Sequence, residues 1–164
     1  MRHKVYFTNK IADKSARLDP HLIRRTVKSA LAAEGVALPC EVSVMVCGDF
    51  EIQAINREFR DVDASTDVLS FPVFDFEAGD FDPQDGEIDI STGLLPLGDI
   101  VLNALQTERQ AAEFGWSRER ETVYLVIHSV LHLLGYDHLD EGEQKREMRV
   151  REKEILAICG YADE

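Results

Sequence analysis

The sequence predicts an α/β (α+β) fold, in which a small mixed four-stranded sheet packs with about five helices, one of them central and buried. Two observations support this fold class. Four short strand-like segments alternate along the chain with segments whose apolar residues recur at helical spacing. The 164-residue chain also shows no internal repeat and no linker-like stretch, so we expect one domain spanning residues 1–164.

The first predicted elements are a strand, a helix and a second strand. Segments 4–9 and 41–47 are rich in β-branched and aromatic residues, which is typical of strands. The helix between them has Asp19 as its N-cap and Pro20 at its first position, and it stops at Gly35. Helices that alternate with short strands in this way indicate a single α/β or α+β layer structure.

The middle of the chain predicts two further helices and two further strands. A helix begins at Asp49, and segments 67–74 and 97–103 predict strands. The acidic stretch 75–93 between these strands is expected to form a solvated loop or hairpin. Another helix is expected over about 103–114.

The last two helices differ in character. Ser117 can cap a helix that stops at Gly135, and residues 123–134 of this helix are apolar on nearly every side. A helix of this kind is buried in the middle of its domain. Asp140 and Glu143 resemble a capping box that opens the final, mixed-charge helix.

The formal net charge of −13 does not exclude a nucleic-acid partner, because the charges are unevenly distributed. Residues 1–28 carry eight Lys or Arg against two acids, whereas residues 71–100 carry eight acids and no Lys or Arg. No apolar run approaches the roughly 20 residues of a membrane span, and the N-terminus lacks a signal-peptide core. Three cysteines without a C-x-x-C pair indicate free thiols, so we expect a cytoplasmic protein with no membrane partner.

Three of the five histidines lie within the segment HSVLHLLGYDH. His128 and His132 are four residues apart, so they project from one face of the predicted central helix. Gly135 can turn the chain so that His138 swings back towards them. Three neutral imidazoles with one open position are the ligand set of a catalytic zinc site. The alternative is a pair of packed core histidines and one exposed histidine.

The spacing of these histidines matches the metzincin protease motif H-E-x-x-H-x-x-G-x-x-H with one difference. Ser129 occupies the position at which the protease has its general-base glutamate. The usual activation of water for peptide hydrolysis is therefore missing. Zinc lowers the pKa of water towards 7 by itself, so hydrolysis of another bond remains open.

Three segments resemble the motifs of one known family. HSVLHLLGYDH is similar to H-G-x-L-H-L-x-G-Y-D-H, INREFRDVDASTDVLSFP to N-x-x-[YF]-R-x-x-x-x-x-T-D-V-L-S-F-P, and LGDIVLN to L-G-D-I-x-I-S. These are the motifs of the YbeY-type endoribonucleases and rRNA maturation factors of bacteria. The chain departs from them at Ser129, where Gly is common, and in the acidic 75–92 segment, which looks like a longer insert.

The resemblance implies one zinc ion held by His128, His132 and His138. It also implies single-strand-specific RNA cleavage in 16S rRNA 3′-end maturation and ribosome quality control, with ribosomal RNA and the small ribosomal subunit as partners. The family's functional arginine corresponds to Arg60, whose guanidinium can grip a phosphate through two hydrogen bonds. From its position, we expect Arg60 to reach the site only if the 60–66 loop folds over the histidine helix.

Several alternatives stay open at this point. Arg60 could instead form a surface salt bridge with Asp63 or Asp67. Asp67, Asp99 and Asp137 are each possible partners for a histidine N–H. The protein could also be another zinc-dependent, metalloprotease-like hydrolase. It could equally be a non-catalytic ribosome-assembly factor with structural zinc, although such sites usually have four protein ligands.

Overall fold

The computed structural model describes residues 2–137 and 142–162. In these ranges the chain forms four strands, five α-helices and two short 3₁₀ turns. They are β1 (Lys4–Asn9), η1 (Lys14–Ala16), α1 (Pro20–Ala33), β2 (Cys40–Cys47), α2 (Asp49–Arg60), β3 (Val68–Pro72), η2 (Pro83–Asp85), β4 (Leu95–Asn103), α3 (Ala104–Phe114), α4 (Arg118–Leu133) and α5 (Glu143–Ile158). The predicted α/β fold class is confirmed.

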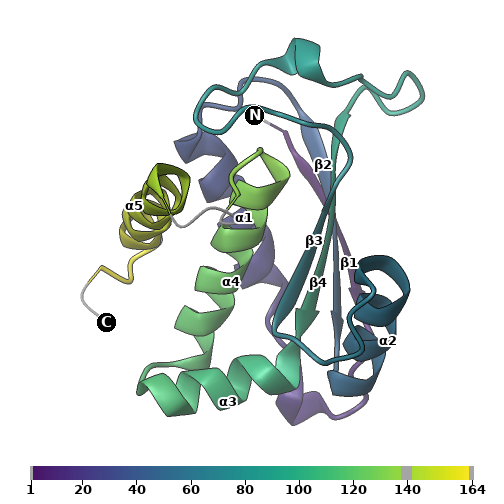
Figure 1. Cartoon of the computed structure of the whole chain (residues 1–164), viewed down its shortest axis with the longest axis vertical. Coiled ribbons are helices and arrows are strands. Elements are labelled where there is room, and N and C mark those ends of the chain that lie inside the picture. The colour runs from purple at the N-terminus through teal and green to yellow at the C-terminus, as the bar shows by residue number, and fades with distance from the viewer. Residues whose placement is uncertain (1, 138–141, 163–164) are drawn as a thin grey trace.

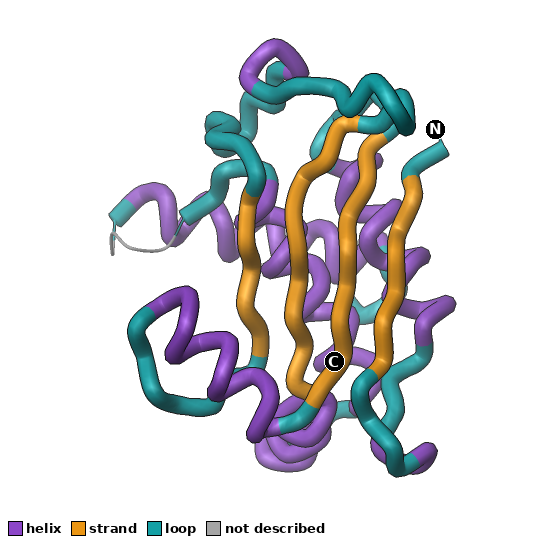
Figure 2. Tube along the Cα trace, turned by 90° about the vertical axis from the view of Figure 1, so that its right-hand side faces the viewer, coloured by secondary structure: helices purple, strands orange, loops and turns teal. Residues whose placement is uncertain are grey.

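The four strands form one mixed sheet in the order β1-β2-β4-β3. β1 pairs with β2 in parallel, because α1 carries the chain back between them. β2 pairs with β4 in parallel, because β3 runs in the opposite direction and returns the chain between them. β3 pairs antiparallel with β4 and closes one edge of the sheet. Figure 2 shows the strands side by side, with β3 at the edge and α2 beside it.

The helices cover the two faces of the sheet unequally. α4 packs against one face together with α1, and α5 lies outside α4, whereas α2 lies on the opposite face (Figure 1). The main core lies between the sheet, α1 and α4, and a small second cluster of Cys47, Ile52 and Val101 lies under α2. In the described part of the chain, no helix has the length and apolarity to cross a membrane.

The central helix α4 is enclosed as its sequence predicts. It contacts α1, α3, α5, β3 and β4, and its apolar residues from Val123 to Leu133 are buried apart from half-buried Tyr124. Ser117 caps it by accepting a hydrogen bond from the Arg120 N–H at 3.1 Å. The predicted Asp140 cap of the next helix lies outside the described residues, and α5 begins at Glu143 after Gly142.

The acidic 75–93 segment is a loop with isolated bridges, and it is less solvated than its composition predicts. Phe76 is buried in the main core, and its ring packs against Phe74 and Phe81. These aromatic residues hold the loop against the core, because burying their apolar area outweighs the preference of the surrounding acids for water.

Gly98 in β4 permits the close approach of α4 to the sheet. Its φ is +142°, and a Cβ atom there would lie 2.2 Å from the Phe71 carbonyl oxygen and 2.9 Å from Leu133 Cδ2. β3 and the C-terminal turn of α4 therefore share the space that a side chain would need.

We expect Gly98→Ala to lower the free energy of unfolding by roughly 3 kcal/mol, from backbone strain together with overpacking. Gly115→Ala is the matched control, because Gly115 also has positive φ but no atom lies within 4 Å of the position that its Cβ would take. It should cost only about 1–2 kcal/mol. Urea unfolding of both variants checks the difference, and equal losses would contradict the packing role of Gly98.

Candidate active site

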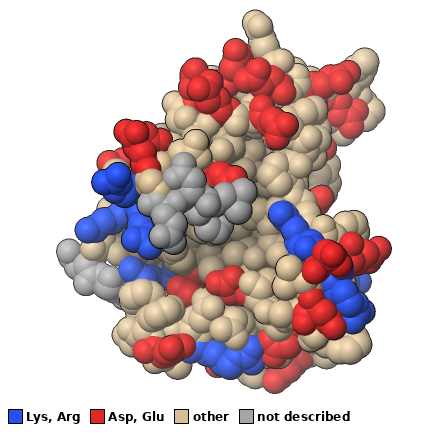
Figure 3. All heavy atoms as spheres, viewed as in Figure 1, with Lys and Arg blue, Asp and Glu red and all other residues tan. Residues whose placement is uncertain are grey.

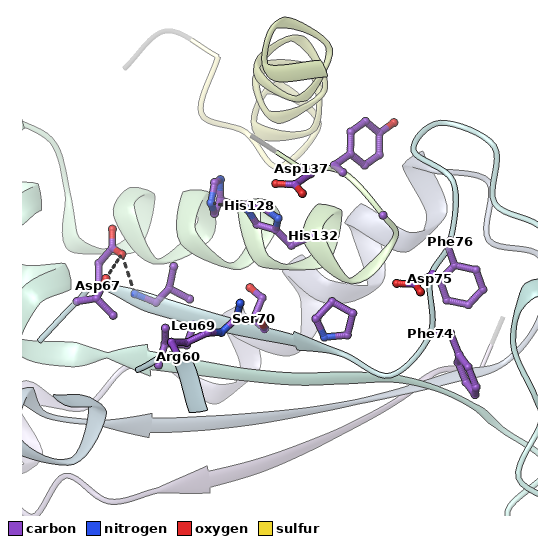
Figure 4. A pocket seen from close by; sticks show the side chains of 15 residues that line it. Arg60, Asp67, Leu69, Ser70, Phe74, Asp75, Phe76, His128, His132 and Asp137 are labelled. Carbon is purple, nitrogen blue, oxygen red and sulfur yellow. Dashed lines mark hydrogen bonds between the residues drawn. The ribbon is translucent and has the colours of Figure 1, made fainter. Parts of the chain in front are cut away.

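A cavity of about 570 Å³ lies between α4, β3 and the acidic loop. Figure 4 shows it from close by, with His128, His132 and Asp137 on the α4 side and Arg60, Leu69 and Ser70 on the β3 side. Its walls come from segments distant in the sequence. The lining residues are Arg60, Thr66, Asp67, Val68, Leu69, Ser70, Pro72, Phe74, Asp75, Phe76, His128, His132, Gly135, Tyr136 and Asp137.

His128 and His132 stand one turn apart on α4, and both face the cavity (Figure 4). Their Nε2 atoms are 3.1 Å apart, and their ring centroids are 4.6 Å apart. Two ligand nitrogens of a tetrahedral zinc ion, each about 2.0–2.1 Å from the metal, are about 3.3–3.4 Å apart. The donor pair therefore fits a metal ion with little movement of either ring.

Glu152 of α5 fixes the orientation of His128. The His128 Nδ1–H donates to Glu152 Oε2 at 2.8 Å, and Glu152 is 6% exposed. This hydrogen bond leaves Nε2 as the acceptor nitrogen, the form that ligates a metal. Sequence reasoning missed Glu152, because in the mixed-charge α5 segment it resembles its solvated neighbours.

The three aspartates considered as histidine partners lie in different places. Asp137 lines the cavity beside His132 (Figure 4). Asp67 also lines it, but accepts hydrogen bonds from the Val68 N–H and the Gln110 amide. Asp99 is exposed on the opposite face of the sheet, in a groove with Met45 and Phe71, so it cannot reach either histidine.

His138, the third predicted ligand, lies outside the described residues. Within residues 2–137 and 142–162, no group of three His, Cys, Asp or Glu side chains has the arrangement of a metal site. Gly135, which precedes His138 in the motif, has a φ of +101°, and a Cβ atom there would lie 2.0 Å from the Phe76 carbonyl oxygen. Only glycine therefore fits the turn that leads from α4 towards His138.

Arg60, the last residue of α2, reaches the cavity around the β3 edge of the sheet. Its guanidinium donates to the Ser70 carbonyl oxygen and lies 5.0 Å from the centroid of the Phe71 ring. The alternative role for Arg60, a salt bridge to Asp63 or Asp67, is absent from the described part of the chain, where Asp63 pairs with Arg57 at 3.5 Å. Arg60 is exposed, so its position is compatible with binding a ligand in the cavity.

Comparisons with known proteins identify the family of this chain. Residues 7–160 match the family model described as Endoribonuclease YbeY. The chain belongs to the endoribonuclease YbeY family. An Endoribonuclease YbeY of Clostridium botulinum strain Loch Maree is 46% identical over 140 residues, covering 82% of this chain and 84% of the relative. An Endoribonuclease YbeY of a Roseiflexus species is 41% identical over 150 residues, covering 92% and 89%.

A solved structure is similar in fold. The solution structure of a Thermotoga maritima protein aligns with a TM-score of 0.60 and 24% identity, covering 94% of this chain and 88% of that one. At this identity the likeness concerns the fold alone. The YbeY family match spans Arg60, Glu152 and the whole HSVLHLLGYDH segment, so the cavity lies inside the matched range.

In this YbeY family member Arg60 lines the cavity although residues 64 and 65 are bonded to α2, so the condition that the 60–66 loop must fold over the histidine helix is wrong. Ala64 accepts a hydrogen bond from Asn56 Nδ2 at 2.9 Å, and Ser65 Oγ donates to Asp49 Oδ1 at 3.2 Å. Asp49 also accepts from Asn103 Nδ2 at 2.7 Å. These bonds hold the loop beside α2. Arg60 reaches the cavity because its side chain is long.

Asp49 carries a pH-dependent part of this network. Hydrogen bonds from Arg109 and Asn103 lower the pKa of Asp49 from 3.8 to about 2. Because the folded pKa lies below the unfolded value, the stabilisation is present above pH 3.8 and is lost as the pH falls towards about 2.

We therefore expect Asp49→Asn to be less stable than wild type at neutral pH, by under about 1 kcal/mol because solvent screens this partly exposed pair. The difference should shrink as the pH falls from about 4 to about 2. Circular-dichroism melts across this range test it, with Asp63→Asn as a control that should stay close to wild type. A difference independent of pH would show that the lost charge is not the cause.

Proposed function

We propose that this protein is a zinc-dependent endoribonuclease that cuts single-stranded RNA. The observation that carries the proposal is the pair of imidazole nitrogens, 3.1 Å apart, at the wall of a cavity that also contains Arg60. Membership of the endoribonuclease YbeY family supports the same reaction class.

In this proposal His128 and His132 hold the zinc ion together with His138. Glu152 keeps the His128 ring in its ligating tautomer and orientation. When bound, zinc supplies Lewis acidity towards a phosphoryl oxygen and a lowered pKa for water. The chain positions the donors and encloses the site beneath the acidic loop.

Arg60 binds the RNA phosphate in this proposal. Its guanidinium has five N–H donors in a planar fork, and the Ser70 carbonyl and the Phe71 ring hold it at the cavity wall. The remaining donors can contact phosphate oxygens and neutralise the charge that develops during phosphoryl transfer. This preorganised position is the reason that a guanidinium suits the role better than a flexible ammonium.

Two features of the site count against the rival functions. Ser129 is completely buried and does not line the cavity, so the protease position for a general base points away from the substrate. The cavity beside the histidines leaves room for a substrate, which a purely structural zinc site does not need.

We further propose that the substrate is the 3′ end of 16S rRNA, handled during maturation and quality control of the small ribosomal subunit in the cytoplasm. The three sequence motifs support this substrate, and the free cysteines Cys40, Cys47 and Cys159 are compatible with a reducing compartment. Incubation of the purified protein with precursor small subunits, followed by mapping of RNA ends, tests it. Intact precursor ends would reject this substrate without rejecting the nuclease.

Purified protein should contain about one equivalent of zinc. His132→Ala should lose most of it, and Glu152→Gln should weaken zinc affinity by about 10–100-fold because the His128 ring is less well oriented. His21→Ala changes an exposed histidine on α1 and serves as the control. Metal analysis and chelator competition measure these effects, and full zinc occupancy in His132→Ala would rule out the site.

Arg60→Ala should lower kcat for RNA cleavage by about two to three orders of magnitude, as loss of one preorganised donor does. Arg60→Lys should not restore it, because an ammonium lacks the two-pronged geometry. Zinc content and melting temperature should stay near wild type. Arg57→Ala is the matched control, one turn earlier on the same helix and outside the cavity lining. Wild-type turnover by Arg60→Ala would remove Arg60 from the mechanism.

A further inference from the structure

A second cavity of about 540 Å³ adjoins the candidate active site and lies between α3, α4 and α5. Three side chains connect the two sites. Asp67 lines both cavities, Glu152 lines the second and holds His128, and the Tyr124 ring lies 6.1 Å from that of His128. The lining residues are Asp67, Gln110, Phe114, Trp116, Arg120, Glu121, Tyr124, Arg149, Glu152, Lys153 and Leu156.

We propose that this second cavity binds one unpaired nucleotide of the RNA, adjacent to the nucleotide whose phosphate is cut. The proposal rests on the proposed endoribonuclease function and adds a binding subsite to it. Its base would stack on the aromatic wall, and its phosphate would contact the cationic wall.

The aromatic wall is a stack of side chains at the α3–α4 junction. Phe114 and Trp116 have ring centroids 5.0 Å apart, and the Arg120 guanidinium carbon lies 3.6 Å from the Trp116 centroid. Phe114 remains 56% exposed, so one aromatic face is available to a ligand. Bases of single-stranded RNA stack on such aromatic and guanidinium planes.

The cationic wall belongs to α5. Arg149 and Lys153 are one turn apart on the face that lines the cavity, and neither forms an ion pair within the described part of the chain. Arg151, on another face of α5, is by contrast paired with Glu34 at 2.7 Å. Two like charges one turn apart repel each other, so a phosphate between them would relieve the repulsion. Figure 3 shows Lys and Arg gathered over α5, beside the central hollow.

Two buried polar atoms in the wall lack a hydrogen-bond partner among the described residues. They are Trp116 Nε1 and Glu121 Oε1, and the Trp116 indole is close enough to the Glu121 carboxyl group to lower its pKa as a hydrogen-bond donor does. Glu121 is 1% exposed, and its other oxygen accepts from Gln110 Nε2 at 2.8 Å. A buried donor and a buried acceptor both gain from a ligand edge that offers the complementary groups, as nucleobase edges do.

This subsite gives a physical reason for a preference for single strands. Bases in a duplex are stacked on each other, and their pairing edges are already hydrogen-bonded. An unpaired base can leave the stack, enter the cavity and place its π-face on Phe114. A duplex cannot do this without loss of base pairing and stacking.

The test combines RNA from which one base has been removed with the variant Phe114→Ala, which lacks the aromatic ring. The zinc-loaded enzyme is given single-stranded RNA oligonucleotides in which successive positions near the cut are abasic. At one position, base removal should raise KM for wild type by about tenfold. Phe114→Ala should raise KM for the intact RNA by the same factor with kcat unchanged. Its KM should not rise further when the base at that position is removed. Phe50→Ala, an 84% exposed phenylalanine on α2, is the control.

A second variant tests the cationic wall independently of the aromatic one. The double change Arg149→Ala and Lys153→Ala should reduce the salt dependence of RNA binding, by about 0.7 in the log–log slope for each phosphate that the protein no longer neutralises. Arg146→Ala removes an exposed charge from α5 outside the cavity lining and should leave the slope unchanged.

The outcomes separate this subsite from the nuclease function. Suppose that wild type cleaves RNA, and that Phe114→Ala and base removal each raise KM by a factor that multiplies when the two are combined. This result would overturn the subsite but would leave the nuclease function intact. Absence of cleavage would overturn the nuclease. Fluorescence anisotropy with the same RNAs would then decide the subsite, since a non-additive loss of affinity supports it and additive losses overturn it. Melting temperatures near wild type for both variants exclude unfolding as the cause.

Discussion

The hydrogen bond between His128 and Glu152 serves both the packing of the fold and the arrangement of the candidate active site. An imidazole on a buried helix loses free energy unless its nitrogens have partners. Glu152 provides one partner from α5 at 2.8 Å, and in doing so it attaches α5 to α4 and orients the His128 Nε2 atom towards the cavity. Burial of the carboxylate is compatible with this because it accepts the imidazole N–H. The attachment of α5 and the orientation of the His128 imidazole therefore depend on the same hydrogen bond.

Two close approaches shape the cavity around this hydrogen bond. Leu133 packs over Gly98, which brings the end of α4 against the sheet, and the Phe76 backbone packs over Gly135, which brings the acidic loop against the turn after α4. Neither position accommodates a Cβ atom. The aromatic anchors of the loop keep it there, so an acidic insertion becomes part of the site's wall although its charges remain in solvent.

The distribution of charge reconciles a net charge of −13 with the proposed binding of RNA. Acidic side chains gather on the 75–93 loop without any Lys or Arg, whereas Lys and Arg occur over α2 and α5, interleaved there with acids (Figure 3). Arg60 enters from one side, and Arg149 and Lys153 line the other cavity. Salt screens the acids of the 75–93 loop that lie more than about 10 Å from these positions at 0.1 M ionic strength.

The residues alone predict the fold class, the order of the strands and helices along the chain, the burial of α4 and the shared face of His128 and His132. These follow from local rules of periodicity and capping, which operate over a few residues. The packing of the folded chain decides that Glu152 is the partner of His128, that Asp99 lies on the far face, and that Arg60 passes around β3. It also decides that Phe114, Arg149 and Lys153 share one cavity. Such contacts join residues far apart in the chain, and the same short patterns are compatible with many packings until the sheet order and helix layers are set.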